Sequence, residues 1–188
     1  MRTEWMVGIV VAVLVVYAVV IYNRLVRQRN MVREGWSGID VQLRRRTDLV
    51  PNLVETVKAY AAHERNLFEE VTARRASSIA ADNVKGQEDA ERALKGALGK
   101  LFALAEAYPQ LKADQNFRKL QDQLAEIEDE LQMARRYYNG TVRDLNINIQ
   151  SFPDVLLARP LGFREAPYFE IDDEAAAVPV IDFAERNP

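Results

Sequence analysis

The sequence predicts an all-α membrane protein. We expect an N-terminal transmembrane helix that continues into an antiparallel up-down four-helix bundle of long helices, followed by an extended C-terminal tail. Residues 5–22 form an uncharged apolar run, most later segments are rich in Ala, Leu, Glu, Arg and Gln, and Pro recurs after residue 152. These residue types favour helix, whereas Pro ends it. We therefore divide the chain into residues 1–22, the short tail and transmembrane helix, 23–152, the bundle, and 153–188, a Pro-rich and acidic tail that packs on the bundle or on a neighbouring subunit.

The run from Trp5 to Tyr22 has the length of a membrane span. As a helix it extends roughly 27 Å, close to the hydrocarbon thickness of about 30 Å. Its many Val residues would favour a strand in water, but in lipid the backbone must satisfy its own hydrogen bonds, which requires a helix. A cleaved signal peptide is disfavoured because Glu4 balances Arg2 and no small-residue cleavage site follows. A buried helix of a soluble protein would need a larger core than this chain can supply.

Four arginines follow the run and predict its orientation. They are Arg24, Arg27, Arg29 and Arg33, whereas only Arg2 precedes it. Because basic flanks stay in the cytoplasm, we expect the N-terminus outside and the large C-terminal domain inside.

The first helix is expected to leave the membrane without a hinge and to end near residue 46. Arg44, Arg45 and Arg46 would lie in its last turn, where cations suit the helix dipole. Its apolar face is formed by Leu25, Val32, Trp36, Ile39 and Leu43.

A break is predicted at residues 47–51, because Pro51 suits the first turn of a new helix. The second helix would then run to about residue 81, and residues 82–86 form a loop. Its apolar face comprises Leu53, Val57, Tyr60, Leu67 and Val71.

The third helix is predicted over residues 88–108, with Pro109 ending it and Asp114 or Asn116 capping the fourth. The fourth helix repeats apolar residues with a period of about 3.5, which is typical of a bundle seam. Its stripe comprises Phe117, Leu120, Leu124, Ile127, Leu131, Ala134, Tyr138, Thr141, Leu145 and Asn148. The third helix is the shorter, so the fourth should extend beyond it at one end.

The up-down topology would place a basic surface next to the bilayer. In this topology the second helix returns to the membrane, and the fourth brings Arg135, Arg136 and Arg143 into the membrane-proximal half. Our membrane-interface hypothesis comprises Trp5, Tyr22, Arg24, Arg27, Arg29, Arg33, Arg74 and Arg75. Anionic lipid is the expected ligand of these arginines.

The sequence predicts no catalytic, cofactor or metal site, so we do not expect an enzyme. The chain has no Cys and one His, His63, which excludes thiolate chemistry, a zincin helix and a di-iron bundle. The acidic run 126–130 is expected on a solvated face. The net charge of −3 gives no case for nucleic acid.

Several longer motifs carry a resemblance. They are Tyr22-Asn23-x-Leu25-Val26; Trp36-Ser37-x-Ile39-Asp40-Val41-Gln42-Leu43-x-Arg45-Arg46-x-Asp48-Leu49-Val50-Pro51-Asn52-Leu53-Val54-Glu55-Thr56-Val57; Tyr60-Ala61-x-His63-Glu64; Tyr137-Tyr138-Asn139; Asn146; Phe152-Pro153; and Pro167-Tyr168-Phe169-Glu170. Over nearly its whole length the chain resembles the LemA family. This resemblance implies a bacterial single-pass protein of the inner membrane with a four-helix domain, and no known reaction or cofactor. Members look like scaffolds or membrane-organising factors, some resemble proteins of specialised intracellular membranes, and gene neighbourhoods suggest a link to membrane proteases.

Two functions therefore remain open. The first is a membrane-anchored scaffold or interaction protein that self-associates into a homo-oligomer. The second is a regulator tethered beside a membrane enzyme such as a protease. In both cases the protein contacts the lipid bilayer, and in the second case it also binds a membrane protein.

Overall fold

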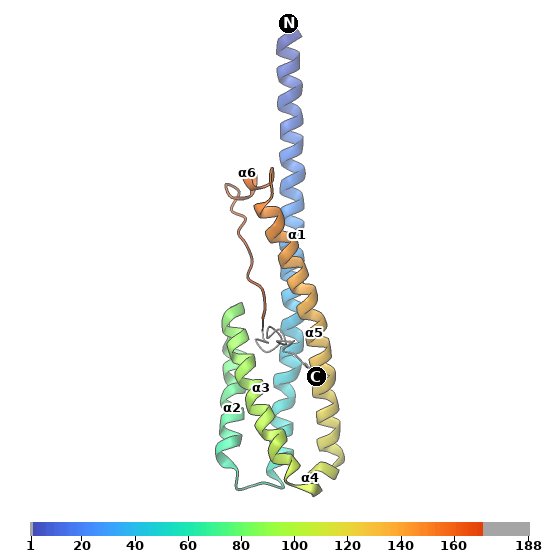
Figure 1. Ribbon diagram of the computed structural model, residues 1–188, viewed down its shortest axis with the longest axis vertical. Helices are drawn as coiled ribbons and strands as arrows, with labels where there is room; N and C mark the ends of the chain where they lie inside the picture. The colour runs from blue at the N-terminus through green and yellow to red at the C-terminus, as the bar shows by residue number, and fades with distance from the viewer. Residues whose placement is uncertain (1, 171–188) are drawn as a thin grey trace, which may run out of the picture.

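The computed structural model describes residues 2–170 and is all-α, which confirms the predicted fold class (Figure 1). Its helices are α1 (Arg2–Lys58), α2 (Arg65–Ala80), α3 (Val84–Glu106), α4 (Pro109–Ala113), α5 (Gln115–Gln150) and α6 (Val155–Ala158). The expectations for residues 171–188 lie outside the described residues.

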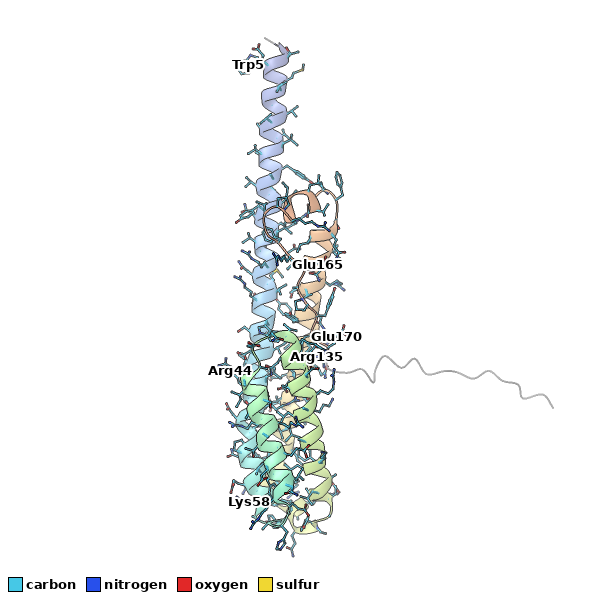
Figure 2. All side chains as sticks on the ribbon, turned by 90° about the vertical axis from the view of Figure 1, so that its left-hand side faces the viewer. Trp5, Arg44, Lys58, Arg135, Glu165 and Glu170 are labelled. Atoms are coloured by element: carbon cyan, nitrogen blue, oxygen red, sulfur yellow. The ribbon has the colours of Figure 1, made fainter. Side chains whose placement is uncertain are left out.

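Helix α1 runs the whole length of the molecule, from Trp5 at one end to Lys58 near the other (Figure 2). Its N-terminal part stands alone, and its remainder packs on α2 and α5. The chain then returns in α2, leaves again in α3 and returns in α5, so the antiparallel order is as predicted. Helix α5 extends well beyond α2 and α3 towards the apolar end of α1, which confirms the predicted overhang.

The predicted break at residues 47–51 is wrong, because α1 continues through Pro51 to Lys58. Pro51 has no N–H, so it cannot donate the usual helical hydrogen bond to the carbonyl of Thr47. The Nε of Arg75 on α2 donates to that carbonyl instead, at 2.6 Å. Because this bond satisfies the Thr47 carbonyl, the helix continues through Pro51. The turn comes later, at residues 59–64, and α2 is shorter than expected.

Two hydrophobic cores follow one another along α1. The distal core unites α1, α2, α3 and α5, and the proximal core unites α1, α5 and the chain after α5. Most of the predicted stripe on α5 is buried. Near the end of α5 the seam shifts, so that Val142, Asn146 and Ile149 are buried and Asn148 is not.

The termini of the middle helices are close to the predictions. Helix α3 begins at Val84, four residues earlier than expected, and the side chain of Asn83 caps it by accepting from the Gly86 N–H at 2.8 Å. Asp114 caps α5. The backbone N–H of Phe117 donates to its carboxylate at 2.9 Å and holds the pKa of Asp114 below its ordinary value.

After α6 the chain returns, extended, along the α1–α5 pair (Figure 1). The side-chain amides of Asn146 and Asn139 each form two hydrogen bonds with its backbone, at Ala166 and at Phe169, over 2.9–3.1 Å. The hydroxyl of Tyr138 donates to the Pro167 carbonyl at 2.8 Å. This segment therefore takes the place that α2 and α3 occupy further from the membrane.

Trp36 belongs to the predicted apolar face of the first helix, but it is only partly buried, where this segment meets the helices. Its ring centroid is 5.5 Å from those of both Tyr138 and Phe169. The adjacent Gly35 allows α5 to come close, since a Cβ there would lie 3.1 Å from the Cα of Tyr138. Gly38 has no such neighbour.

A buried polar network connects all four long helices. Arg46 of α1 pairs with Glu91 of α3 at 3.1 Å and with Glu128 of α5. The hydroxyl of Ser78 on α2 and the amide of Gln87 both donate to the second oxygen of Glu91. The Glu91 side chain is fully buried and that of Arg46 is 7 % exposed. The network therefore replaces the hydration that these charges lose.

Removing Arg46 should destabilise the bundle strongly. The Arg46→Ala change leaves the Glu91 carboxylate buried without its cation, which costs about 3–5 kcal/mol. The adjacent Arg45→Ala change is the control, because Arg45 pairs with Glu130 at 3.0 Å on the surface and such pairs contribute less than about 1 kcal/mol. Denaturant unfolding in detergent measures both. Equal losses would contradict the structural role of the network.

Candidate membrane interface

The N-terminal part of α1 is long and apolar enough to cross a membrane. An 18-residue window within it has a mean hydropathy of 2.7 and is only 6 % buried. Large apolar side chains project from it all round, and Val20 near its end is still 58 % exposed. At the next residue, Ile21, one face of the helix becomes buried: Ile21 is 2 % exposed, whereas Tyr22 is still 44 % exposed. The helix therefore passes from a lipid-suited surface to a protein core within one turn, beside Tyr22, as the sequence predicted.

Residues 151–163, which include α6, pack on α1 at this boundary (Figure 1). We call them the α6 collar. Within it Ala158 and Phe163 are buried. The ring of Phe163 meets Tyr22 edge-on at 5.9 Å, and the Arg29 guanidinium lies 5.2 Å from its centroid. No periodic pattern in the sequence predicts this contact.

Arg24 forms an ion pair with Asp154 of the collar. The Asp154 side chain is 3 % exposed and that of Arg24 is 49 % exposed. Arg24 therefore neutralises a buried carboxylate, and Arg29 covers Phe163. Two of the four predicted juxtamembrane arginines thus fasten the collar to α1.

Arg27 and Arg33 are exposed, and within residues 2–170 neither forms an ion pair. Along the helix axis Arg27 lies about 8 Å beyond Tyr22 and Arg33 about 17 Å. The headgroup layer is roughly 5–8 Å thick, and the field of anionic lipid falls off over a Debye length of about 8 Å. Arg27 is therefore the better placed to meet lipid phosphates.

Arg74 and Arg75 do not reach the level of these arginines, so that part of the prediction is wrong. Helix α2 ends at Ala80, and Arg75 bonds the Thr47 carbonyl. Thr47 lies about 21 Å further along α1 than Arg33. The error follows from the misplaced start of α2, which made the helix too long.

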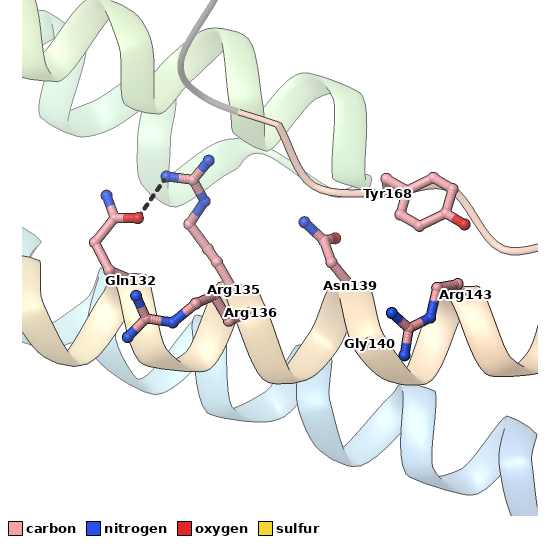
Figure 3. Close-up of a pocket in the computed structure, with 7 residues that line it drawn as sticks. All are labelled: Gln132, Arg135, Arg136, Asn139, Gly140, Arg143 and Tyr168. Atoms are coloured by element: carbon pink, nitrogen blue, oxygen red, sulfur yellow. Dashed lines mark hydrogen bonds between the residues drawn. The ribbon is translucent and has the colours of Figure 1, made fainter. Parts of the chain in front are cut away.

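A basic pocket of about 380 Å³ lies between α5 and the returning chain (Figure 3). Its cations come from the membrane-proximal half of α5, as predicted, and Tyr168 closes one side. Arg135 donates to Gln132 at 3.3 Å, and Arg143 pairs with Asp144. The pocket lies at the level of the Trp36–Tyr138 contact, well away from the bilayer, so its charge suits an acidic group of a protein more than a lipid.

The other polar candidates give no reactive constellation. His63 is exposed in the turn after α1, and residues 2–170 contain no group of His, Asp and Glu side chains that could hold a metal ion. The acidic run of α5 is not wholly solvated, because Glu128 reaches Arg46 and Glu130 reaches Arg45.

Residues 35–183 match the LemA family. Magnetosome protein MamQ 2 of Paramagnetospirillum magneticum is 27 % identical over 186 residues, which cover 85 % of this chain and 68 % of that protein. MamQ of Magnetospirillum gryphiswaldense is 26 % identical with the same coverage. Protein LemA of Metamycoplasma hominis is 25 % identical over 158 residues, which cover 80 % of this chain and 69 % of the length of that protein.

Arg27 should recruit anionic lipid. The Arg27→Gln change removes a contribution of about 1 kcal/mol, which corresponds to about fivefold in lipid preference. Fluorescence quenching between the reconstituted full chain and labelled anionic or neutral lipids measures that preference. Arg74→Gln is the control and should leave it unchanged. If both variants behave as the parent at low salt, Arg27 does not bind lipid.

Proposed function

Because the chain belongs to the LemA family, we propose that this membrane-anchored helical protein is a single-pass scaffold of the bacterial inner membrane. The observation that carries the proposal is the continuity of α1 from its apolar run to Lys58. A helix without a hinge transmits the position of its anchor to the whole bundle. The bundle then presents its side surfaces at a fixed height above the bilayer.

We place the N-terminus outside and the bundle in the cytoplasm. The support for this orientation is the excess of arginine directly after the apolar run, which follows the positive-inside rule. Arg24 and Arg29 also hold the α6 collar, but their charges act during insertion, before the collar folds.

A membrane-organising role is supported by the relatives that are named magnetosome proteins. We extend from these names only the association with a membrane structure. The buried side chains of Arg46, Glu91 and Ser78 are bonded to one another, which suits stability more than chemistry. We therefore propose a role without catalysis, cofactor or nucleic acid.

Self-association is supported by apolar side chains on the outer surface of the α1–α5 pair. Val41 is 50 % exposed, Met133 55 % and Tyr137 47 %. Met133 and Tyr137 are four residues apart and share a face of α5, and the Tyr137 ring borders Gly35 of α1. Copies anchored in one membrane present this surface at the same height, so a second copy is its natural occupant.

The alternative function is a regulator tethered beside a membrane enzyme such as a protease. The basic pocket of α5 favours this alternative, because Arg136 and Arg143 offer exposed charge to an acidic segment of a partner. In this case the chain would act as one subunit of a mixed complex.

Native mass measurement of the full chain in mild detergent separates the two functions. A scaffold should form a homo-oligomer of defined size, whereas a regulator should co-purify from its own membrane with a second membrane protein in fixed ratio. We expect the homo-oligomer.

The apolar surface gives a sharper test. The Met133→Glu change should dissociate the homo-oligomer, because it places a charge where an apolar contact is required. Ile79→Glu is the matched control, since Ile79 is 59 % exposed on α2 and should leave the mass unchanged. A parent chain that stays monomeric in nanodiscs and in detergent would contradict the scaffold.

A further inference from the structure

The α6 collar carries the most exposed large apolar side chains outside the apolar run of α1, within the part of the chain that the structure describes. Phe152 is 80 % exposed and Leu156 is 63 % exposed, which are the two highest values there, and Leu161 of the same loop is 49 % exposed. Phe152 exceeds even Trp5, at 75 %. Three such side chains on one short loop are costly in water and indicate a surface that is covered in use.

The opposite face of the collar is fixed to α1. Ala158 and Phe163 are buried against the helix, and the only acid of the collar, Asp154, is paired with Arg24. The Tyr22–Phe163 contact puts the collar at the end of the lipid-suited surface. Ile21 shows the same placement, because it is 2 % exposed whereas its neighbours Val20 and Tyr22 are 58 % and 44 % exposed.

We propose that the α6 collar is a second membrane contact. Phe152, Leu156 and Leu161 enter the boundary between headgroups and acyl chains beside the span of the same chain. Interfacial segments of this kind bury their apolar side chains about 5–10 Å deep. The occupant of the surface is therefore the lipid of the bilayer that α1 crosses.

Continuity and charge both favour lipid as the occupant. The exposed apolar surface of α1 ends where the collar begins, so the two surfaces meet at one bilayer face. Asp154 is neutralised by its pair, Arg159 on the collar and Arg164 directly after it are exposed cations, and the exposed acid Glu165 follows them. An apolar surface bordered by arginine matches the acyl boundary and the phosphates above it.

The contact has a mechanical consequence. A lone transmembrane helix is free to rotate about its axis, and its tilt is set by neighbours and interfacial anchors. The collar lies to one side of α1 (Figure 1). Lipid contact on that side limits the rotation of α1 about its axis and therefore sets the orientation of the bundle relative to the membrane.

The experiment measures the depth of the collar in the full chain. The chain has no Cys, so Leu156→Cys provides one attachment point for an environment-sensitive fluorophore. Ile79→Cys is the matched control, because Ile79 is 59 % exposed and lies on α2, which ends well short of the collar. Both proteins are reconstituted into phosphatidylcholine vesicles with and without phosphatidylglycerol.

The label at 156 should be quenched several-fold more by lipid carrying a shallow acyl-chain nitroxide than the label at 79, and should be protected from aqueous iodide. Because the insertion is apolar, the result should hold in neutral vesicles. A label at 156 that iodide reaches as readily as the control overturns the proposal. A label shielded from iodide but not quenched by the nitroxide lipid assigns the surface to a protein partner and also overturns it.

A second substitution covers the case in which Leu156→Cys disturbs the collar. Arg159→Cys places the label at an exposed site without removing an apolar side chain. Its quenching by shallow nitroxide lipid should exceed that of the Ile79 control and should fall when Phe152, Leu156 and Leu161 are all changed to Ser. Quenching at 159 that equals the control overturns the proposal independently.

Discussion

The structure depends on α1 serving two environments as one uninterrupted helix. Up to Val20 its side chains suit lipid, and from Ile21 onward one face is protein core. In lipid the backbone must be helical to satisfy its own hydrogen bonds, and the bundle keeps that helix going by packing. Pro51 would normally interrupt it, and the bond from Arg75 to the Thr47 carbonyl offsets the lost one. The anchor and the bundle therefore move as one body.

The lengths of the other helices follow from this arrangement. Among the long helices of residues 2–170, only α5 accompanies α1 towards the membrane, because α2 and α3 stop near the buried Arg46 network. Two helices alone cannot enclose a core, so the returning chain supplies the third side, held through Asn139 and Asn146. The junction of Trp36, Tyr138 and Phe169 lies where the four-helix part gives way to this thinner part.

Sequence periodicity predicted what depends on local pattern. It gave the anchor, the antiparallel order, most of the α5 seam and the cap at Asp114. It misplaced the first turn, because the rule for Pro51 is local whereas the carbonyl it frees is satisfied from another helix. It missed the Arg46–Glu91 pair, whose members are separated by 45 positions in the sequence, and the collar contact of Arg24 with Asp154, separated by 130 positions. Periodicity within one helix carries no information about contacts between segments so far apart. As a result, Arg75 does not lie at the predicted membrane surface but bonds the Thr47 carbonyl. Arg24 and Arg29 do lie there, and both contact the collar.

If α1 is one helix across the bilayer surface, the distance between two points on either side of that surface is determined by the helix rise. Spin labels at Val20→Cys and Glu55→Cys lie on exposed positions of the helix, and this otherwise Cys-free chain carries no competing thiol. In nanodiscs, with labelled chains diluted into unlabelled ones so that distances between copies do not contribute, pulsed electron–electron double resonance should give one narrow distribution centred at about 53 Å, the rise of an unbroken helix between these positions. A broad distribution, or one centred at clearly shorter distance, would show a hinge at the membrane surface or at Pro51 and would contradict the account.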